Sequence, residues 1–305
     1  MKIFDCFMYF DEETVLDLRL NILDKYVDYF IIVESIYTHK GEKRNLKFNS
    51  KKFTRFKNKI KYFIYDEIPK KIEPILETDN ENDKGRKYIM NAIYRENGQR
   101  DYISAGLKDA KDNDLVLISD VDEIPNLNNF NFNALKEKII IFKQDMFYYK
   151  LNLKLPNIIW SGTKACKKKD LLSPQWLRNI KDRKYPIYRL DTFFSKKKYS
   201  SIKFIDNGGW HFSNLKTAQE IEYKLRSYLH HREFDENPMT TNEIENIIKN
   251  KQAIYDLRVD QRVNKIGGTG SKLVLYPFEK LPKFIQNNQE LYKDWIDKNE
   301  KKLLD

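Results

Sequence analysis

The stretch that decides the fold class reads Leu115-Val116-Leu117-Ile118-Ser119-Asp120-Val121-Asp122-Glu123-Ile124-Pro125. Its first half is an uninterrupted apolar run, which is typical of a strand buried on both faces. In open α/β sheets, ligands bind at the carboxyl ends of such strands. Asp120 and Asp122 lie at that end and could hold a hard divalent cation, which prefers oxygen ligands. The alternative is a strand end followed by a solvated acidic turn.

The segments before this stretch alternate between expected strands and an expected helix. Apolar runs predict strands at residues 2–9, 30–33 and 60–64. Between the first two, Asp11 can cap a helix whose apolar residues recur at helical spacing up to Val27. This order predicts an α/β fold with a central, mixed but mostly parallel sheet flanked by helices.

The rest of the chain predicts further elements around the same sheet. Thr217 and Glu220 have the spacing of a capping box at the start of a helix. The expected organisation is a main domain at 1–240 and a helical C-terminal extension at 241–305 that packs on it. We expect strands within 138–153 and at 201–205, an irregular segment at 156–169, and helices at 86–110, 173–180, 217–231, 242–255 and 282–302.

Two charged residues fall on the apolar face of the helix expected at 86–110. Glu96 and Arg100 share this face with isoleucines such as Ile93 and Ile103. Charges within an apolar stripe are expensive unless they are paired or used. Their i, i+4 spacing allows a mutual ion pair. The other interpretation is that Arg100 reaches past the helix to a diphosphate.

The composition describes a folded, basic protein. The chain is 41% hydrophobic, carries a formal net charge of +11 and has two cysteines, too few for a disulfide scaffold. No stretch approaches the roughly 20 apolar residues of a transmembrane helix, and the N-terminus does not resemble a signal peptide. We therefore expect a soluble, cytoplasmic protein. The lysines are scattered and no nucleic-acid-binding motif accompanies them, so no specific nucleic-acid partner is expected.

Further polar residues follow two of the expected strands. Residues 34–43 offer hydrogen-bond donors and acceptors where a nucleotide would lie, although such loops are often plain polar surface. His211 follows two glycines that let the backbone approach a ligand, so it is the best candidate for a third metal ligand, with a structural role as the alternative. Trp160 and Trp210 could stack on a sugar or base, or pack in the core.

Several short motifs occur in a specific order along residues 3–235. They are Phe4-Asp5-Cys6-Phe7, Leu18-Arg19-Leu20, Val33-Glu34-Ser35, Thr38-His39-Lys40-Gly41, Arg95-Glu96-Asn97-Gly98-Gln99-Arg100-Asp101, residues 119–125, Gly209-Trp210-His211-Phe212-Ser213 and residues 224–230. Each motif alone is weak, but the ordered set resembles glycosyltransferase family 17.

The resemblance implies a GT-A-type fold and a metal-dependent, inverting transfer of a sugar to a glycan hydroxyl. The nucleotide-sugar donor expected from it is UDP-N-acetylglucosamine. Asp120-Val121-Asp122 matches the Asp-x-Asp motif of that fold, whose Mn²⁺ or Mg²⁺ neutralises the leaving diphosphate. The expected metal ligands are Asp120, Asp122 and His211.

The resemblance also implies a general base and a donor-binding set. Inversion in one displacement requires a base for the acceptor hydroxyl. Asp206 is the first choice for it, and Glu123 and Glu34 are the alternatives. The residues expected to bind the donor are Glu34, Thr38, His39, Lys43, Arg95, Arg100, Asp120, Trp210 and Ser213.

Two other functions compete with sugar transfer. Haloacid-dehalogenase-type phosphatases also place Asp-x-Asp after an apolar strand, but early in the chain and with Thr or Val where this chain has Ile124. A non-enzymatic basic module for nucleic acid or glycan would bind in a salt-sensitive way that survives Asp122→Ala. A transferase would instead lose Mn²⁺-dependent transfer in that variant.

Overall fold

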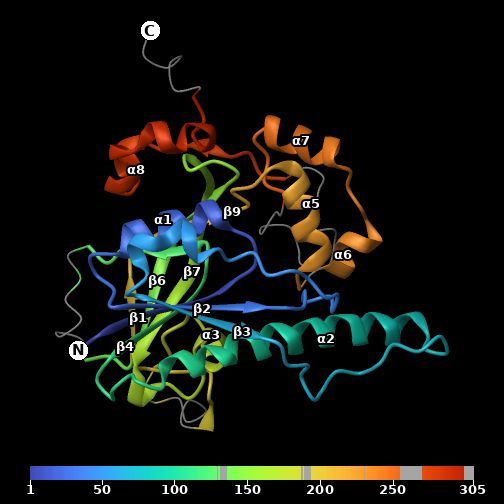
Figure 1. Cartoon of the computed structure of the whole chain (residues 1–305), viewed down its shortest axis with the longest axis horizontal. Helices are drawn as coiled ribbons and strands as arrows, with labels where there is room; N and C mark the ends of the chain where they lie inside the picture. Colours follow the sequence, from blue (N-terminus) through green and yellow to red (C-terminus); the bar gives the residue numbers. More distant parts are fainter. Residues whose placement is uncertain are drawn as a thin grey trace.

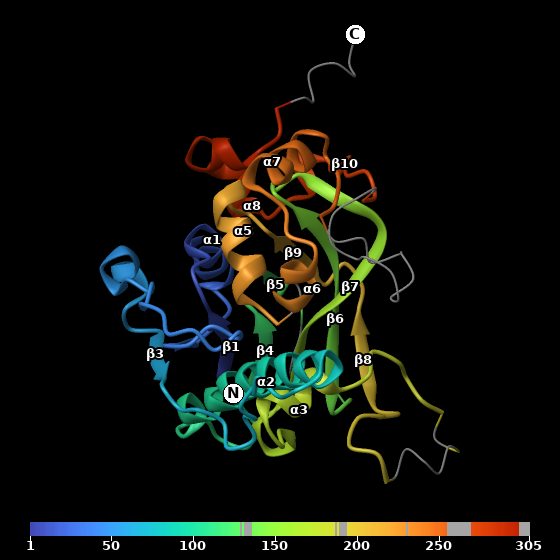
Figure 2. The ribbon, with the colours of Figure 1, turned by 90° about the vertical axis from the view of Figure 1, so that its right-hand side faces the viewer.

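The computed structural model describes residues 1–128, 130, 136–186, 188, 194–229, 231–254 and 270–298. These residues build a sheet with helices on both of its faces (Figure 1, Figure 2). The strand order is β3-β2-β1-β4-β7-β6-β9-β5, with β10 beside β7 and β8 beside β6. The strands are β1 (Ile3–Tyr9), β2 (Tyr29–Ser35), β3 (Ile60–Tyr65), β4 (Leu115–Asp120), β5 (Glu123–Pro125), β6 (Ile139–Tyr148), β7 (Leu153–Lys167), β8 (Ile202–Ile205), β9 (Gly209–Ser213) and β10 (Val274–Leu275).

The sheet has a parallel half and a mixed half. Strands β3, β2, β1 and β4 run parallel to one another. Strand β7 is antiparallel to both β4 and β6, whereas β8 and β9 are parallel to β6. The predicted α/β class, a mostly parallel mixed sheet flanked by helices and consistent with a GT-A-type fold, is confirmed.

Helices cover both faces because side chains alternate along each strand. Phe7 and Tyr9 of β1 pack in the cluster that contains the apolar face of α1 (Glu13–Leu23). Phe4 and Cys6 pack on the other face, on the side of α2 and α3 (Figure 1). The remaining helices are α2 (Glu81–Asp101), α3 (Pro174–Asn179), α5 (Ala218–Ser227), α6 (His231–Glu236), α7 (Thr241–Lys249) and α8 (Lys283–Asn287), and the 3₁₀ segments are η1 (Ser50–Phe56), η2 (Tyr102–Leu107), η4 (Lys168–Asp170), η5 (Phe278–Lys280) and η6 (Gln289–Trp295).

A fully buried ion pair joins α1 to the sheet and to the turn after β4. Arg19 Nη2 lies 2.6 Å from Asp5 Oδ1 on β1, and both side chains are 0% exposed. Arg19 Nη1 also donates to the carbonyl oxygens of Asp120, Val121 and Glu123 at 2.8–3.2 Å. One guanidinium group therefore sets the backbone of the turn that carries the paired acids.

Two sequence predictions about secondary structure are wrong. Residues 156–167 are not irregular but belong to β7, where Pro156 and Gly162 lie at the two register shifts in its pairing with β6. The segment 282–302 is not one helix. Helix α8 ends at Asn287, because the φ of −127° at Asn288 is not helical, and η6 follows. Residues 299–302 lie outside the described residues.

The other helices appear with shifted bounds. Asn80 accepts a hydrogen bond from the N–H of Asp83, so α2 begins at Glu81, and it gives way to η2 after Asp101. The capping box predicted at Thr217 is confirmed. In the predicted C-terminal extension, α7 contacts α5 and α8 contacts α1, while residue 255 lies outside the described residues. Among the helices that are described, none has the length and apolar character needed to cross a membrane.

Arg19→Met should lower the free energy of unfolding by about 3–5 kcal/mol, because Asp5 would stay buried without its partner. Urea denaturation followed by circular dichroism measures this change. Lys52→Met removes an ion pair with Glu13 in which both side chains are about half exposed, and it should have little effect. Equal losses in the two variants would contradict the role of Arg19 as a buried anchor.

Candidate active site

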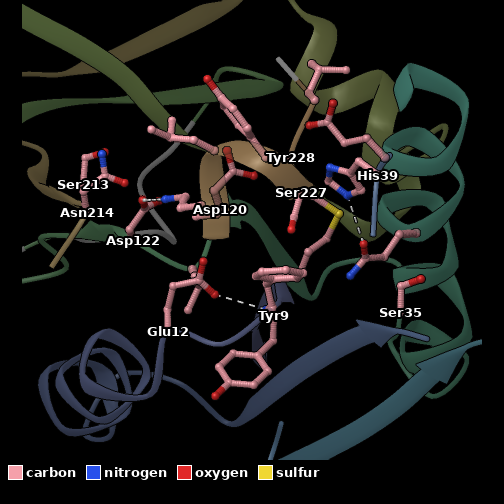
Figure 3. A pocket seen from close by; sticks show the side chains of 18 of the residues that line it. Tyr9, Glu12, Ser35, His39, Asp120, Asp122, Ser213, Asn214, Ser227 and Tyr228 are labelled. Atoms are coloured by element: carbon pink, nitrogen blue, oxygen red, sulfur yellow. Dashed lines mark hydrogen bonds and ion pairs between the residues drawn. The ribbon is translucent and has the colours of Figure 1, made fainter. Parts of the chain in front are cut away.

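A pocket of about 470 Å³ opens where β1, β2 and β4 end. This is the carboxyl edge of the parallel strands, where α/β sheets bind ligands, and the volume suits a small molecule. Helices α2 and α5 and strands β6, β7 and β9 complete its walls. Figure 3 shows the side chains of Asp120, Asp122 and His39 gathered around it.

Two arginines hold the Asp120 carboxylate. Arg100 from α2 donates to Oδ1 at 2.9 Å, and Arg178 from α3 donates to Oδ2 at 2.7 Å. Burial alone would raise the pKa of Asp120, but the charges of Arg178 and Arg100 outweigh burial and hold the pKa well below its usual range. Asp120 is therefore ionised at neutral pH.

Arg100 also makes the internal pair that its spacing predicts. Its Nη2 lies 2.8 Å from Glu96 Oε1, and its side chain is 3% exposed. The ion pair is confirmed. Arg100 also lines the pocket and could reach a ligand there. Its contact with a diphosphate stays a prediction.

Glu123 is a fully buried carboxylate with several donors around it. Its Oε2 accepts the N–H of Asp120 at 2.9 Å, and Arg178 donates to both carboxylate oxygens at 2.6 and 2.7 Å. Trp160 Nε1 donates to Oε1 at 2.5 Å. Since these bonds occupy the carboxylate and solvent does not reach it, Glu123 is poorly suited to accept a proton from a substrate.

Asp122, His211 and Lys224 meet on the pocket side of the turn. His211 Nε2 lies 3.5 Å from Asp122 Oδ1, and Lys224 Nζ lies 3.9 Å from Oδ2. Both distances exceed those of good hydrogen bonds, so the carboxylate keeps capacity for a ligand. His211 Nδ1 is buried and has no hydrogen-bond partner among the described residues.

Asp122 and His211 fit a divalent cation that is shared with a ligand. Carboxylates suit Mn²⁺ and Mg²⁺, and imidazole is the commonest metal-binding side chain. Such ions often take one or two side chains and complete their shell with substrate phosphates and water. Within the ranges that the structure describes, no three His, Cys, Asp or Glu side chains form a metal-binding group. Asp120 faces its two arginines, so its role as a ligand stays a prediction.

The opposite end of the pocket is polar. His39 Nε2 lies 3.3 Å from Gln99 Oε1, and Ser35 and Ser227 lie near them (Figure 3). Ser227 Oγ is buried and has no hydrogen-bond partner in the described part of the chain. A buried hydroxyl without a partner costs free energy unless a ligand or water bonds it. This end of the pocket therefore suits a ligand with polar groups.

Glu34, predicted as a donor-binding residue or base, is committed elsewhere. It is fully buried, pairs with Arg44 at 2.9 Å, and accepts the N–H groups of Lys47 and Phe48 and the hydroxyl of Tyr62. These bonds tie the loop after β2 to the sheet. The structure therefore gives Glu34 a structural setting rather than a place in the pocket.

The predicted site residues divide into two groups. Six of them line the pocket: His39, Arg100, Asp120, Asp122, His211 and Ser213. The others lie outside its lining: Glu34, Thr38, Lys43, Arg95, Glu123, Asp206 and Trp210. Thr38 closes a turn by accepting the N–H of Gly41, and Arg95 donates to the carbonyls of the same loop. Lys43 and Asp206 are exposed, and Trp210 packs against the core on the α1 side.

Arg178 belongs to the candidate site but was not identified from the sequence. It lies 58 residues from Asp120 along the chain, so no local spacing reveals the pair. Its helix is fixed at the end by Lys164, which donates to the carbonyls of Arg178 and Ile180 at 2.6 Å. Ser173-Pro174 is typical of a helix start and predicts α3. It does not indicate that Arg178 of this helix contacts Asp120. Lys224 belongs to the motif at residues 224–230, but the sequence pattern indicated no role for it in the site.

Arg178→Met should lower the free energy of unfolding by about 3–5 kcal/mol, because Asp120 and Glu123 would lose a shared guanidinium. Arg178→Lys should recover only part of this loss, since an ammonium group cannot reproduce the fork of hydrogen bonds. Chemical denaturation measures both variants. Arg226→Met, which removes a partly exposed pair with Glu222 on α5, is the matched control. A Lys variant as stable as the wild type would argue against the fork.

The comparison with known families agrees with this fold and pocket. The model of glycosyltransferase family 17 matches residues 1–296, almost the whole chain. No curated protein sequence matches the chain significantly. The family match decides against the phosphatase and the non-enzymatic binding module. The chain belongs to glycosyltransferase family 17 and is therefore an enzyme that transfers sugar groups.

Proposed function

We propose that the protein is a metal-dependent, inverting transferase that moves N-acetylglucosamine from UDP-N-acetylglucosamine to a glycan hydroxyl. The observation that carries this proposal is the grouping of Asp122, His211 and Lys224 beside the arginine-held Asp120. This group lies at the carboxyl ends of the parallel strands, where a nucleotide donor would bind. The choice of donor follows from the family resemblance of the motifs.

In this proposal Asp122 and His211 hold Mn²⁺ or Mg²⁺ next to Asp120. The cation would supply positive charge for the leaving diphosphate and orient its oxygens. The chain supplies the rigid frame around it. Arg19 fixes the backbone of the turn, and Arg178 fixes the Asp120 side chain. Such a frame needs little reorganisation when negative charge develops on the leaving diphosphate. Electrostatic stabilisation is most effective when the stabilising groups are already in place.

Lys224 adds a second positive charge on the same side. Its Nζ approaches Asp122 only to 3.9 Å, and its side chain is 20% exposed and lines the pocket. An ammonium group with donors to spare can bond diphosphate oxygens. The nearby Lys216 differs because its Nζ is hydrogen-bonded to Asp11. Lys224 is therefore the lysine proposed to contact the donor.

Inversion in one displacement also needs a group that takes the proton of the attacking hydroxyl. Glu34 and Glu123 are fully buried, and their carboxylates are occupied by other donors. Asp206 is exposed at the turn between β8 and β9, away from the pocket lining. The structure supports none of these three as the base, so the proposal does not give them that role.

The protein should release UDP from UDP-N-acetylglucosamine in the presence of Mn²⁺ and a glycan mixture, and a chelator should stop this. Asp122→Asn should reduce transfer by roughly 100-fold or more. A coupled UDP assay measures the rate, and NMR of the product should show a β-linkage. Lys43→Ala changes an exposed residue outside the pocket and should keep full activity. Full transfer by Asp122→Asn would contradict the metal site.

Lys224→Met should raise the KM for the donor at least about tenfold, because a hydrogen bond to a charged group is lost. Thermal stability should stay near that of the wild type, since the Lys224 ion pair is loose. Lys224→Arg, which keeps the charge, is the control and should retain most of the donor affinity. If the KM of Lys224→Met were unchanged, Lys224 would not contact the donor.

A further inference from the structure

The mixed half of the sheet gives the pocket an apolar wall. Met146 and Tyr148 from β6, Trp160 from β7, and Ile254 line this side. Trp160 is half-buried, while the other three are buried. The wall at the ends of β1 and β2 is mixed instead, because Met8 and Phe10 line it together with polar groups such as Ser35. The pocket therefore joins an apolar wall to a wall on which apolar and polar groups are mixed.

The indole of Trp160 is held in one orientation. Its Nε1 donates to Glu123 Oε1 at 2.5 Å, and Glu123 is itself held by Arg178. The ring centroid lies 5.2 Å from that of His211, with an angle of 43° between the planes. Since the indole N–H is its sole polar donor and is already bonded, Trp160 can offer a ligand only its apolar ring surface.

A sugar ring fits such a surface. A pyranose carries C–H groups on its faces and hydroxyls around its edge, so a face can stack on an indole while the hydroxyls reach polar groups. Ser213 and Asn214 also line the pocket and lie beside Asp122 (Figure 3). Trp160 contacts His211, and His211 faces Asp122. A ring stacked on Trp160 would thus lie next to the proposed diphosphate site.

We propose, on the basis of the transfer reaction above, that Trp160 is the stacking surface for the sugar ring of the acceptor. The nucleotide of the donor belongs at the ends of β1 and β2, and its diphosphate at Asp122 and Lys224. The apolar wall lies beyond that point, where the sugar of the donor must meet the hydroxyl that accepts it, and the indole is assigned to the ring of the acceptor. Glu123 is a positioning residue for this surface, because it acts through the indole N–H.

Two substitutions of Trp160 separate stacking from packing. UDP release from UDP-N-acetylglucosamine with Mn²⁺ is measured with and without the methyl β-glycosides of mannose, glucose, galactose and N-acetylglucosamine. Trp160→Leu should raise the KM of the best glycoside on the order of tenfold, while the KM of UDP-N-acetylglucosamine and the rate of UDP release into water stay near wild-type values. Trp160→Phe keeps a ring and should lose less. Trp176→Leu is the control. Trp176 lies on α3 outside the pocket lining, and its indole donates to the carbonyl of Lys196.

An unchanged glycoside KM in Trp160→Leu would overturn the proposal. A matching rise in the KM of UDP-N-acetylglucosamine would also overturn it, by assigning Trp160 to the donor. Saturation-transfer NMR with the same glycosides and no donor is an independent measurement. Glycoside binding that is present in the wild type and lost in Trp160→Leu would support the stacking surface, even if the enzyme turned over no donor. Absence of donor turnover would contradict only the proposed function. No glycoside binding to the wild type in either assay would overturn the stacking surface.

Discussion

Arg19 carries its charge into the layer between α1 and the sheet, where Asp5 is its counter-charge. Burying two charges costs several kcal/mol per ion unless hydrogen bonds satisfy them fully. Here Nε and Nη2 bond the two oxygens of Asp5, Nη2 also bonds Ser119, and Nη1 bonds three carbonyls of the turn. Each nitrogen of the guanidinium group thus has an acceptor for its N–H groups. A lysine could not replace it, because one ammonium group cannot span Asp5 and the turn.

The charges around the turn form two layers with different tasks. Arg19 holds the backbone from the α1 side, whereas Arg178 and Arg100 hold side chains from the α2 and α3 side. Asp120 is therefore ionised and oriented before any ligand arrives. Asp122 lies outside both layers and keeps looser contacts. Asp120, which is held rigidly, and Asp122, which is available to a ligand, lie two positions apart in one short motif.

The sequence predicts those parts of the site that depend on local pattern. An apolar run followed by acids predicts β4 and its carboxylates, and the i, i+4 spacing predicts the Glu96–Arg100 pair. Side-chain direction at a strand end is harder to predict. Glu34 lies two residues after Ile32 in β2 and therefore shares its face on the α1 side, where Arg44 and Tyr62 bond its carboxylate. A polar residue at the end of a strand can face either the pocket or the α1 side of the sheet. The sequence pattern alone does not decide between these two orientations.

Partners far apart in sequence were beyond prediction for a related reason. Strand β7 contains Pro156 and Gly162, which weaken a strand pattern, yet pairing with β6 accommodates both at register shifts. This long strand places Trp160 beside Glu123 and brings Lys164 under the end of α3. The position of Arg178 therefore depends on a strand that local propensity does not favour. Tertiary pairing determines the strand, and the strand determines the site.

Glu123 connects the two sides of the proposed reaction. Its oxygens accept hydrogen bonds from the N–H of Asp120, from Nη1 and Nη2 of Arg178 and from the indole of Trp160. In the proposed arrangement, Asp120 lies on the donor side and Trp160 on the acceptor side. A shift of either residue would have to break or stretch a bond to the same buried carboxylate. Because a buried, fully bonded group resists such movement, Glu123 would hold donor and acceptor in fixed relative positions, as a displacement between two bound substrates requires.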